Sequence, residues 1–163
     1  MDSQVLDSQS LVLFHTALSL VGIVAGLIVL YGLLTAKRMR GMTLLFLVTT
    51  IATSATGYLF HRDHILPSHI VGALSLVVLA ITSAALYSFK LRGAGRAVYV
   101  IGAVASLYLN VFVLVAQAFL KVPSLHALAP TGAEPPFAIA QGIVLVLFIV
   151  LGFRALRKFW PLG

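Results

Sequence analysis

Residues 97–120, AVYVIGAVASLYLNVFVLVAQAFL, contain no aspartate, glutamate, lysine or arginine. Four other stretches of similar length are also free of these residues: 8–36, 41–61, 64–89 and 135–153. A helix needs about 20 largely apolar residues to cross the hydrocarbon of a bilayer. In lipid a spanning segment must satisfy its backbone hydrogen bonds internally, as a helix does. The sequence therefore predicts an all-α, polytopic membrane helix bundle with five transmembrane helices, at about 11–35, 42–60, 68–88, 98–120 and 136–156.

The composition excludes an ordinary soluble protein. Apolar residues make up 61% of the 163 residues and charged residues 9%, against roughly 45–50% and 25% in soluble domains. We find no internal repeat and no polar segment that would form a soluble domain. Residues 1–163 are therefore predicted to be a single integral membrane domain that contacts the lipid bilayer.

Most lysines and arginines fall on one predicted side of the membrane. Three short loops or ends carry them, whereas the other side has two basic residues and all four acids. Because short loops rich in lysine and arginine stay in the cytoplasm, we expect the N-terminus outside and the C-terminus in the cytoplasm. The net charge of +7 then has a topological origin, and no nucleic-acid partner is predicted. The first group is Lys37, Arg38, Arg40, Lys90, Arg92, Arg96, Arg154, Arg157 and Lys158; the second is Arg62, Lys121, Asp2, Asp7, Asp63 and Glu134.

Two further features narrow the chemistry. The N-terminal residues MDSQ lack the positive charge of a signal peptide, so we expect the first helix to be retained. The chain has no cysteine, which excludes disulfides, thiolate metal sites and iron–sulfur clusters held by cysteine.

Polar side chains inside the predicted helices indicate which faces point into the bundle, since each costs free energy in lipid. One stripe in the second helix runs through Thr50, Ser54, Gly57 and His61, and one in the fourth through Gly102, Ser106, Asn110 and Gln117. Amides can simply join helices by hydrogen bonds, or they can line a ligand pocket. The candidate pocket-lining residues are Ser19, Ser54, Asn110, Gln117 and Gln141.

All five histidines fall on the predicted outer side. Neutral imidazole binds zinc, copper, iron and nickel, and a histidine pair can ligate haem. The alternative is that these histidines are loop residues in the headgroup region or satisfy nearby backbone groups. The candidate ligands are His15, His61 and His69, with His64 and His126 in reserve. Their spacing is not diagnostic of either kind of site.

Two segments carry a resemblance to known proteins. One is YLNVFVLVAQAFLKVP at 108–123, continuing through LHALAP at 125–130 to EPPF at 134–137; the other is LPSHIVG at 66–72. They resemble small uncharacterised inner-membrane proteins of Gram-negative bacteria, which implies a multi-pass protein of the bacterial inner (plasma) membrane. The chain is also similar to cytochrome b561-type proteins in being a small helical bundle with histidines. Those proteins place ligands toward both faces, whereas here the histidines lie toward one.

Three classes of function follow from these observations. The leading hypothesis is a periplasm-facing, histidine-lined pocket that binds a transition metal or haem b, for redox chemistry or metal handling. The second is a small-solute carrier or channel, although no aspartate or glutamate lies within a predicted span to couple transport to ions. The third is a non-catalytic partner or assembly subunit of a membrane complex or homo-oligomer. The sequence does not decide whether the chain is an enzyme.

Overall fold

The computed structural model describes the backbone of residues 2–59 and 67–160, and the side chains of 9–59 and 69–160. Its helices occur in the order α1 (Asp2–Leu34), α2 (Arg40–Thr56), α3 (Pro67–Ser83), α4 (Ala94–Lys121), α5 (Pro123–His126) and α6 (Pro135–Lys158). A 3₁₀ turn, η1 (Gly57–Leu59), extends α2, and a π-helical turn, η2 (Ala84–Ser88), extends α3.

Five helices within the described ranges are long and apolar enough to cross a membrane, the same number as the predicted spans. Each lies close to its predicted position, and the differences are at the ends. The helix α1 begins well before residue 11, and α2 and α3 change to 3₁₀ and π geometry in their last turns. The segment between the fourth and fifth predicted spans contains the single-turn helix α5 and a compact turn.

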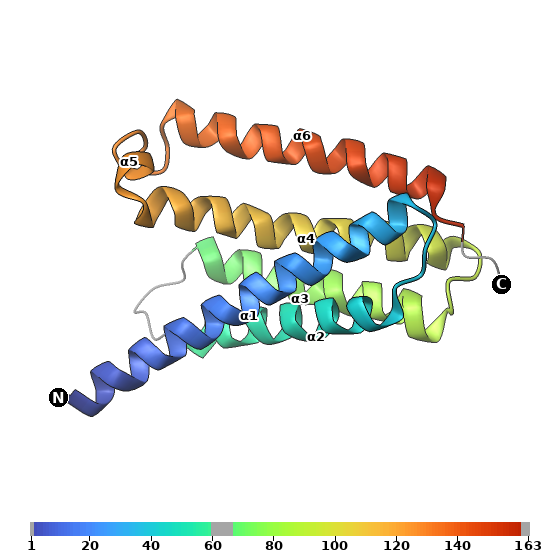
Figure 1. Cartoon of the computed structure of the whole chain (residues 1–163), viewed down its shortest axis with the longest axis horizontal. Coiled ribbons are helices and arrows are strands. Elements are labelled where there is room, and N and C mark those ends of the chain that lie inside the picture. The colour runs from blue at the N-terminus through green and yellow to red at the C-terminus, as the bar shows by residue number, and fades with distance from the viewer. Residues whose placement is uncertain (1, 60–66, 161–163) are drawn as a thin grey trace.

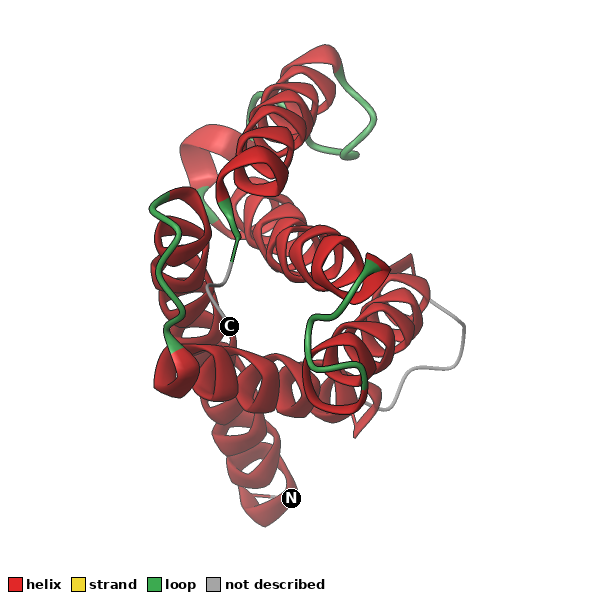
Figure 2. Cartoon of the chain, turned by 90° about the vertical axis from the view of Figure 1, so that its right-hand side faces the viewer, coloured by secondary structure: helices red, strands yellow, loops and turns green. Residues whose placement is uncertain are grey.

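Four helices form a ring and α6 lies outside it. Neighbours in the ring are α1 and α2, α2 and α3, α3 and α4, and α4 and α1. The helix α6 packs along α4 and also touches α1 (Figures 1 and 2). Because α6 has neighbours on one side only, most of its apolar side chains are exposed, including Ile143, Val146 and Phe153.

Local sequence explains where the helices begin and end. Pro67 and Pro135 stand at the first positions of α3 and α6, where a missing N–H costs no hydrogen bond. The helix α1 ends when Ala36 adopts a left-handed conformation (φ 56°) and the amide of Lys37 donates to the carbonyl of Gly32 at 2.8 Å. Glycine usually occupies this left-handed position.

The apolar core is densest where α1, α2, α3 and α4 pack through small residues. A Cβ on Gly26 would lie 2.6 Å from Cδ1 of Leu107 and 2.8 Å from the ring of Phe46. A Cβ on Gly102 would overlap the side chain of Thr82. Such close approach of helices through small residues is typical of membrane bundles.

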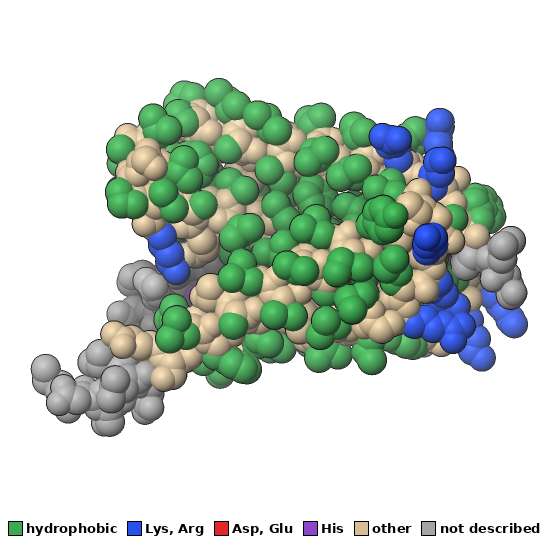
Figure 3. Space-filling view, in the orientation of Figure 1, with side chains coloured by type: hydrophobic (Ala, Val, Ile, Leu, Met, Phe, Trp, Pro, Cys, Tyr) green, Lys and Arg blue, Asp and Glu red, His purple; other side chains and the backbone are tan. Residues whose placement is uncertain are grey.

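The two ends of the bundle differ in charge. We call one end the basic end; it carries Lys37, Arg38, Arg40, Lys90, Arg92, Arg96, Arg154, Arg157 and Lys158. We call the other the His15 end, where Lys121 closes α4. Figure 3 shows apolar side chains over the middle of the molecule and Lys and Arg gathered at the basic end. This pattern suits a protein whose middle contacts lipid tails.

Candidate functional site

The interior of the ring contains a polar group about halfway along the helices. The amide Nδ2 of Asn110 on α4 donates to the hydroxyl of Thr50 on α2 at 3.2 Å. A Cβ on Gly22 of α1 would lie 3.1 Å from Oγ1 of Thr49, 3.2 Å from Oγ1 of Thr50 and 3.7 Å from Nδ2 of Asn110. Three helices therefore meet at this point, and the absence of a side chain at Gly22 makes room for the polar groups.

Two hydroxyls flank this group and have no hydrogen-bond partner among the described residues. They are Oγ1 of Thr53, whose residue is 8% exposed, and Oγ of Ser106, whose residue is 0% exposed. Thr53 lies one turn from Thr50 toward the His15 end, and Ser106 lies one turn from Asn110 toward the basic end. Thr49 instead donates its hydroxyl to the carbonyl of Leu45 at 2.7 Å. A buried polar atom without a partner costs about 1–3 kcal/mol.

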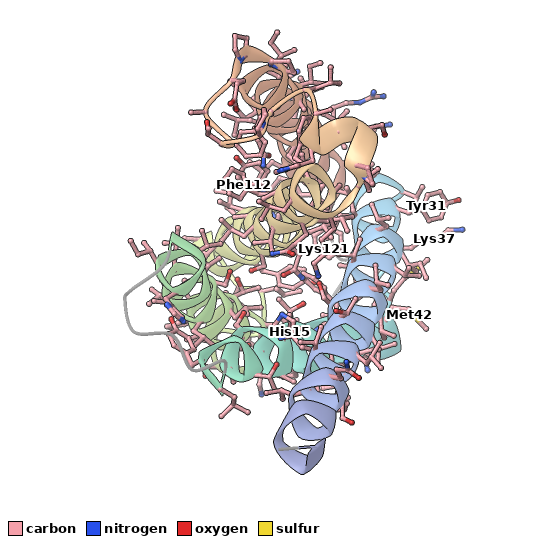
Figure 4. All side chains as sticks on the ribbon, turned by 90° about the vertical axis from the view of Figure 1, so that its left-hand side faces the viewer. His15, Tyr31, Lys37, Met42, Phe112 and Lys121 are labelled. Carbon is pink, nitrogen blue, oxygen red and sulfur yellow. The ribbon has the colours of Figure 1, made fainter. Side chains whose placement is uncertain are left out.

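The polar interior continues to the His15 end. Nδ1 of His15 lies 2.9 Å from Oγ1 of Thr56. Because the Thr56 hydroxyl already donates to the carbonyl of Ala52 at 2.8 Å, its oxygen accepts a hydrogen bond from His15. Figure 4, viewed from this end, shows His15 and Lys121 directed toward the centre of the ring. The Lys121 ammonium lies close enough to interact electrostatically with the imidazole.

The other histidines do not join His15 in a metal site among the described residues. The ring of His69 stacks on Tyr58 with centroids 5.5 Å apart, and the Tyr58 hydroxyl donates to the His69 carbonyl at 2.7 Å. His126 is exposed in α5. His61 and His64 lie outside the described residues. Within the part of the chain that the structure describes, no three histidine or acidic residues converge to hold a metal ion.

The pocket-lining candidates separate into three kinds. Ser54 and Asn110 are buried, and Ser19 is half-buried on α1. Gln117 is exposed. Gln141 is buried between α6 and α4, where its Nε2 donates to the carbonyl of Phe112 at 3.0 Å. Within the described part of the chain, its Oε1 has no hydrogen-bond partner. This glutamine belongs to the seam between α4 and α6, because Phe112 is on α4.

Bulky side chains close the polar interior toward the basic end. Phe46 and Leu107 are buried beside Gly26. Beyond them Tyr99 reaches from α4 to α2, and its hydroxyl lies 3.3 Å from Oγ1 of Thr43. The interior therefore changes from hydroxyl and amide groups at the His15 end to aliphatic and aromatic groups at the basic end.

Sequence reasoning missed three contributors to the polar interior: Thr49, Thr53 and Thr56. The available signal was the density of threonine in α2, at 43, 49, 50, 53 and 56. These threonines do not all lie on one face of the helix, so their positions did not indicate a single polar stripe. Lys121 was counted as a loop charge, although its position at the end of α4 places it over the interior.

Comparison of the chain with protein-family models, with curated proteins and with solved structures yields no match. The side chains of the polar interior provide an uncharged set of hydroxyl and amide groups inside a membrane bundle. Among the described residues, no aspartate, glutamate, lysine or arginine is buried.

Proposed function

We propose that the chain is a membrane carrier or channel for a small, uncharged polar solute. The observation that carries the proposal is the group of buried hydroxyls and amide around Thr50 and Asn110, two of whose neighbours, Thr53 and Ser106, have unpartnered hydroxyls. A solute with its own donors and acceptors would bind these hydroxyls. The hydrogen bonds to the protein would take the place of those that the solute makes with water.

The chemistry of the interior favours neutral solutes over ions. A charge in the low-dielectric interior needs a counter-charge or several strong dipoles. The buried described residues offer none of the four charged types. At the His15 end, Lys121 would also repel cations, in the way that a basic residue excludes cations from other membrane pores. Alcohols, amides and urea-like solutes fit these conditions.

The membrane orientation belongs to the same proposal. Nine basic residues gather at the basic end, and the rule for lysine- and arginine-rich loops would place this end in the cytoplasm. The His15 end would then face outward, which in a bacterial inner membrane is the periplasm. Under this orientation a solute enters beside His15 and Lys121 and reaches Thr53 first.

A flux measurement tests the function. Protein reconstituted in liposomes should speed the uptake of glycerol or urea, followed by light scattering after rapid mixing. Thr53→Val keeps the shape of the side chain and removes the hydroxyl. We expect this variant to lower the flux about fivefold, because one hydrogen bond to the solute is worth about 1 kcal/mol. Ser106→Ala should have an effect of similar size.

The same variant has an opposite effect on stability. Since Thr53 Oγ1 is buried without a partner, its removal should raise the free energy of unfolding by about 1 kcal/mol. Thr16→Val is the matched control, because the hydroxyl of Thr16 is exposed and donates to the carbonyl of Val12. It should leave flux unchanged. Uptake no faster than in empty liposomes for every neutral solute would overturn the proposal.

The metal or haem site and the partner-subunit function stay predictions. A metal site would need His61 or His64 beside His15, and those two residues lie outside the described ranges. An absorption spectrum and metal analysis of the purified protein decide this point directly. Co-purification with a stoichiometric second protein would favour the partner function.

A further inference from the structure

The chain turns back across the basic end after α6. Phe159 leaves helical geometry (φ −77°, ψ 97°), and its side chain is 1% exposed. Figure 2, viewed from the basic end, shows where α6 ends beside the other helices. Phe159 is thus buried against the bundle, although it lies just beyond the last turn of α6.

Arg96, near the start of α4, holds this segment in place. Its Nη1 donates to the carbonyls of Leu156 and Phe159, both at 2.8 Å. Its guanidinium carbon lies 3.9 Å from the centre of the Trp160 ring. Hydrogen bonds from a charged donor are stronger than those between neutral groups. One side chain therefore fixes both the last turn of α6 and the two residues after it.

Phe159 packs on Tyr99, the side chain that reaches from α4 to α2 across the ring of helices. Its centroid lies 5.9 Å from that of Tyr99. Tyr99 is 3% exposed and reaches Thr43 of α2. Tyr99 and Phe159 therefore form an aromatic layer at the basic end of the interior. We call these two residues the closing layer.

We propose that Arg96 is a positioning residue that holds the closing layer shut, and that its release opens the interior to the basic end. The inference rests on the proposed solute pathway. The hydrogen bonds of Arg96 can break and re-form, because the carbonyls of Leu156 and Phe159 that accept them lie at the basic end of the bundle. There water or lipid headgroups can replace the guanidinium. A carrier needs such an end that closes and opens.

Cysteine accessibility tests the inference without measuring flux. The chain has no cysteine, so Ser106→Cys introduces one reporter thiol, on the same face of α4 as Tyr99 and two turns away. An uncharged, membrane-impermeant methanethiosulfonate that carries a sugar group is applied to each end in turn, using right-side-out and inverted vesicles. Lys90→Cys and Lys121→Cys identify the basic end and the His15 end.

We expect the reporter to react slowly from the basic end when Arg96 is present. Adding Arg96→Gln should raise that rate about tenfold or more, since two charge-assisted hydrogen bonds are lost. Arg157→Gln is the control. It removes the same charge from the same end, but Arg157 lies over Phe153 on the exposed side of α6, and the rate should not change.

A merely structural role gives a different result. If Arg96→Gln lowers the melting temperature but leaves the rate from the basic end unchanged, Arg96 only caps α6 and the inference fails. Phe159→Ala and Trp160→Ala are companion variants that keep Arg96 in place, in case Arg96→Gln does not fold. Both should raise the rate, and an unchanged rate in both would also overturn the inference.

The two proposals fail separately. If the reporter reacts from the His15 end in the parent but never from the basic end in any variant, the result supports the proposed solute pathway. It excludes the proposed role of Arg96 in closing the basic end. If the reporter instead reacts from the basic end only in Arg96→Gln and never from the His15 end, the result supports the role of Arg96 in holding the closing layer. It argues against solute entry beside His15.

Discussion

The helices contact one another through different kinds of side chain in the two halves of the bundle. Toward the His15 end, neighbouring helices meet through hydroxyl and amide groups around Thr50 and Asn110. Toward the basic end, they meet through glycines that admit large side chains, and Tyr99 and Phe159 form an aromatic layer. Two threonine hydroxyls there have partners: Thr82 donates to the carbonyl of Val78 and Thr43 pairs with Tyr99.

This difference separates stability from binding. Close packing through small residues makes the basic half the stable part of the bundle. The two unpartnered hydroxyls, Thr53 and Ser106, flank the polar group and lower stability there. Sites that bind ligands commonly carry such a cost. Variants placed in each half can test whether the halves behave as described.

The largest effect should come from filling Gly102 in the basic half. Even a Cβ atom at this position would overlap the side chain of Thr82 on α3. We expect Gly102→Val to lower the free energy of unfolding by about 3 kcal/mol, the upper range for overpacking a core. Unfolding in mixed micelles, followed by circular dichroism, measures the change.

Gly142 on α6 provides the matched control for this substitution. A Cβ there meets nothing within 4 Å. Gly142→Ala should raise stability by about 0.5 kcal/mol through helix propensity. Equal effects at Gly102 and Gly142 would show that the basic half is not closely packed and would remove the contrast between the halves.

A smaller effect should follow from removing the amide at the centre of the polar group. Asn110→Ala deletes the bond to Thr50. Hydrogen bonds between membrane helices contribute about 1 kcal/mol, so we expect a loss of this size in the same unfolding measurement. Gln117→Ala, seven residues further along α4 and exposed, should change stability by much less. A larger loss at Gln117 would contradict the assignment of Asn110 as the polar centre.

The smallest effect concerns the turn before α6, outside the spans. Burial by itself raises the pKa of the Glu134 carboxyl, but hydrogen bonds from the amide and hydroxyl of Thr131 and from the amide of Ala133 outweigh it and hold this pKa below its usual value of 4.5. The stabilisation is therefore present above pH 4.5 and is lost as the pH falls through the lowered pKa.

Carbon-13 NMR of the Glu134 carboxyl during an acid titration measures this pKa. Thr131→Ala should move the pKa back toward 4.5, because it removes the hydroxyl donor. Stability of the bundle should hardly change in either case, since the turn lies at the His15 end of α6 and is exposed. A normal pKa in the parent protein would contradict the hydrogen bonds described for this turn.

The sequence predicted the spans well because length and charge determine them. Each stretch free of charged residues became a helix, and the three basic groups came together at one end. The side of α2 that carries Thr50, Ser54 and Gly57 was also predicted correctly to face other helices. Thr50 and Ser54 are buried, and Gly57 lies beside His15.

The convergence of side chains at one depth could not be predicted in the same way. Depth follows from position in the span, but direction around the helix axis depends on the crossing of neighbours. His69 lies near the start of its span, yet its ring stacks on Tyr58. Gln117 continues the stripe of Asn110, yet α1 leans away from α4 toward the N-terminal end, which leaves this turn of α4 uncovered (Figure 1).

The outer position of α6 also has a consequence for the order of assembly. This helix follows the other four along the chain, and the ring of α1 to α4 already encloses the bond between Thr50 and Asn110. Synthesis can therefore complete the ring while α6 is still being inserted. Until α6 docks, the Gln141 amide lacks its partner on α4, and the hydrogen bond formed on docking favours this step. Arg96 then joins the last turn of α6 to the start of α4.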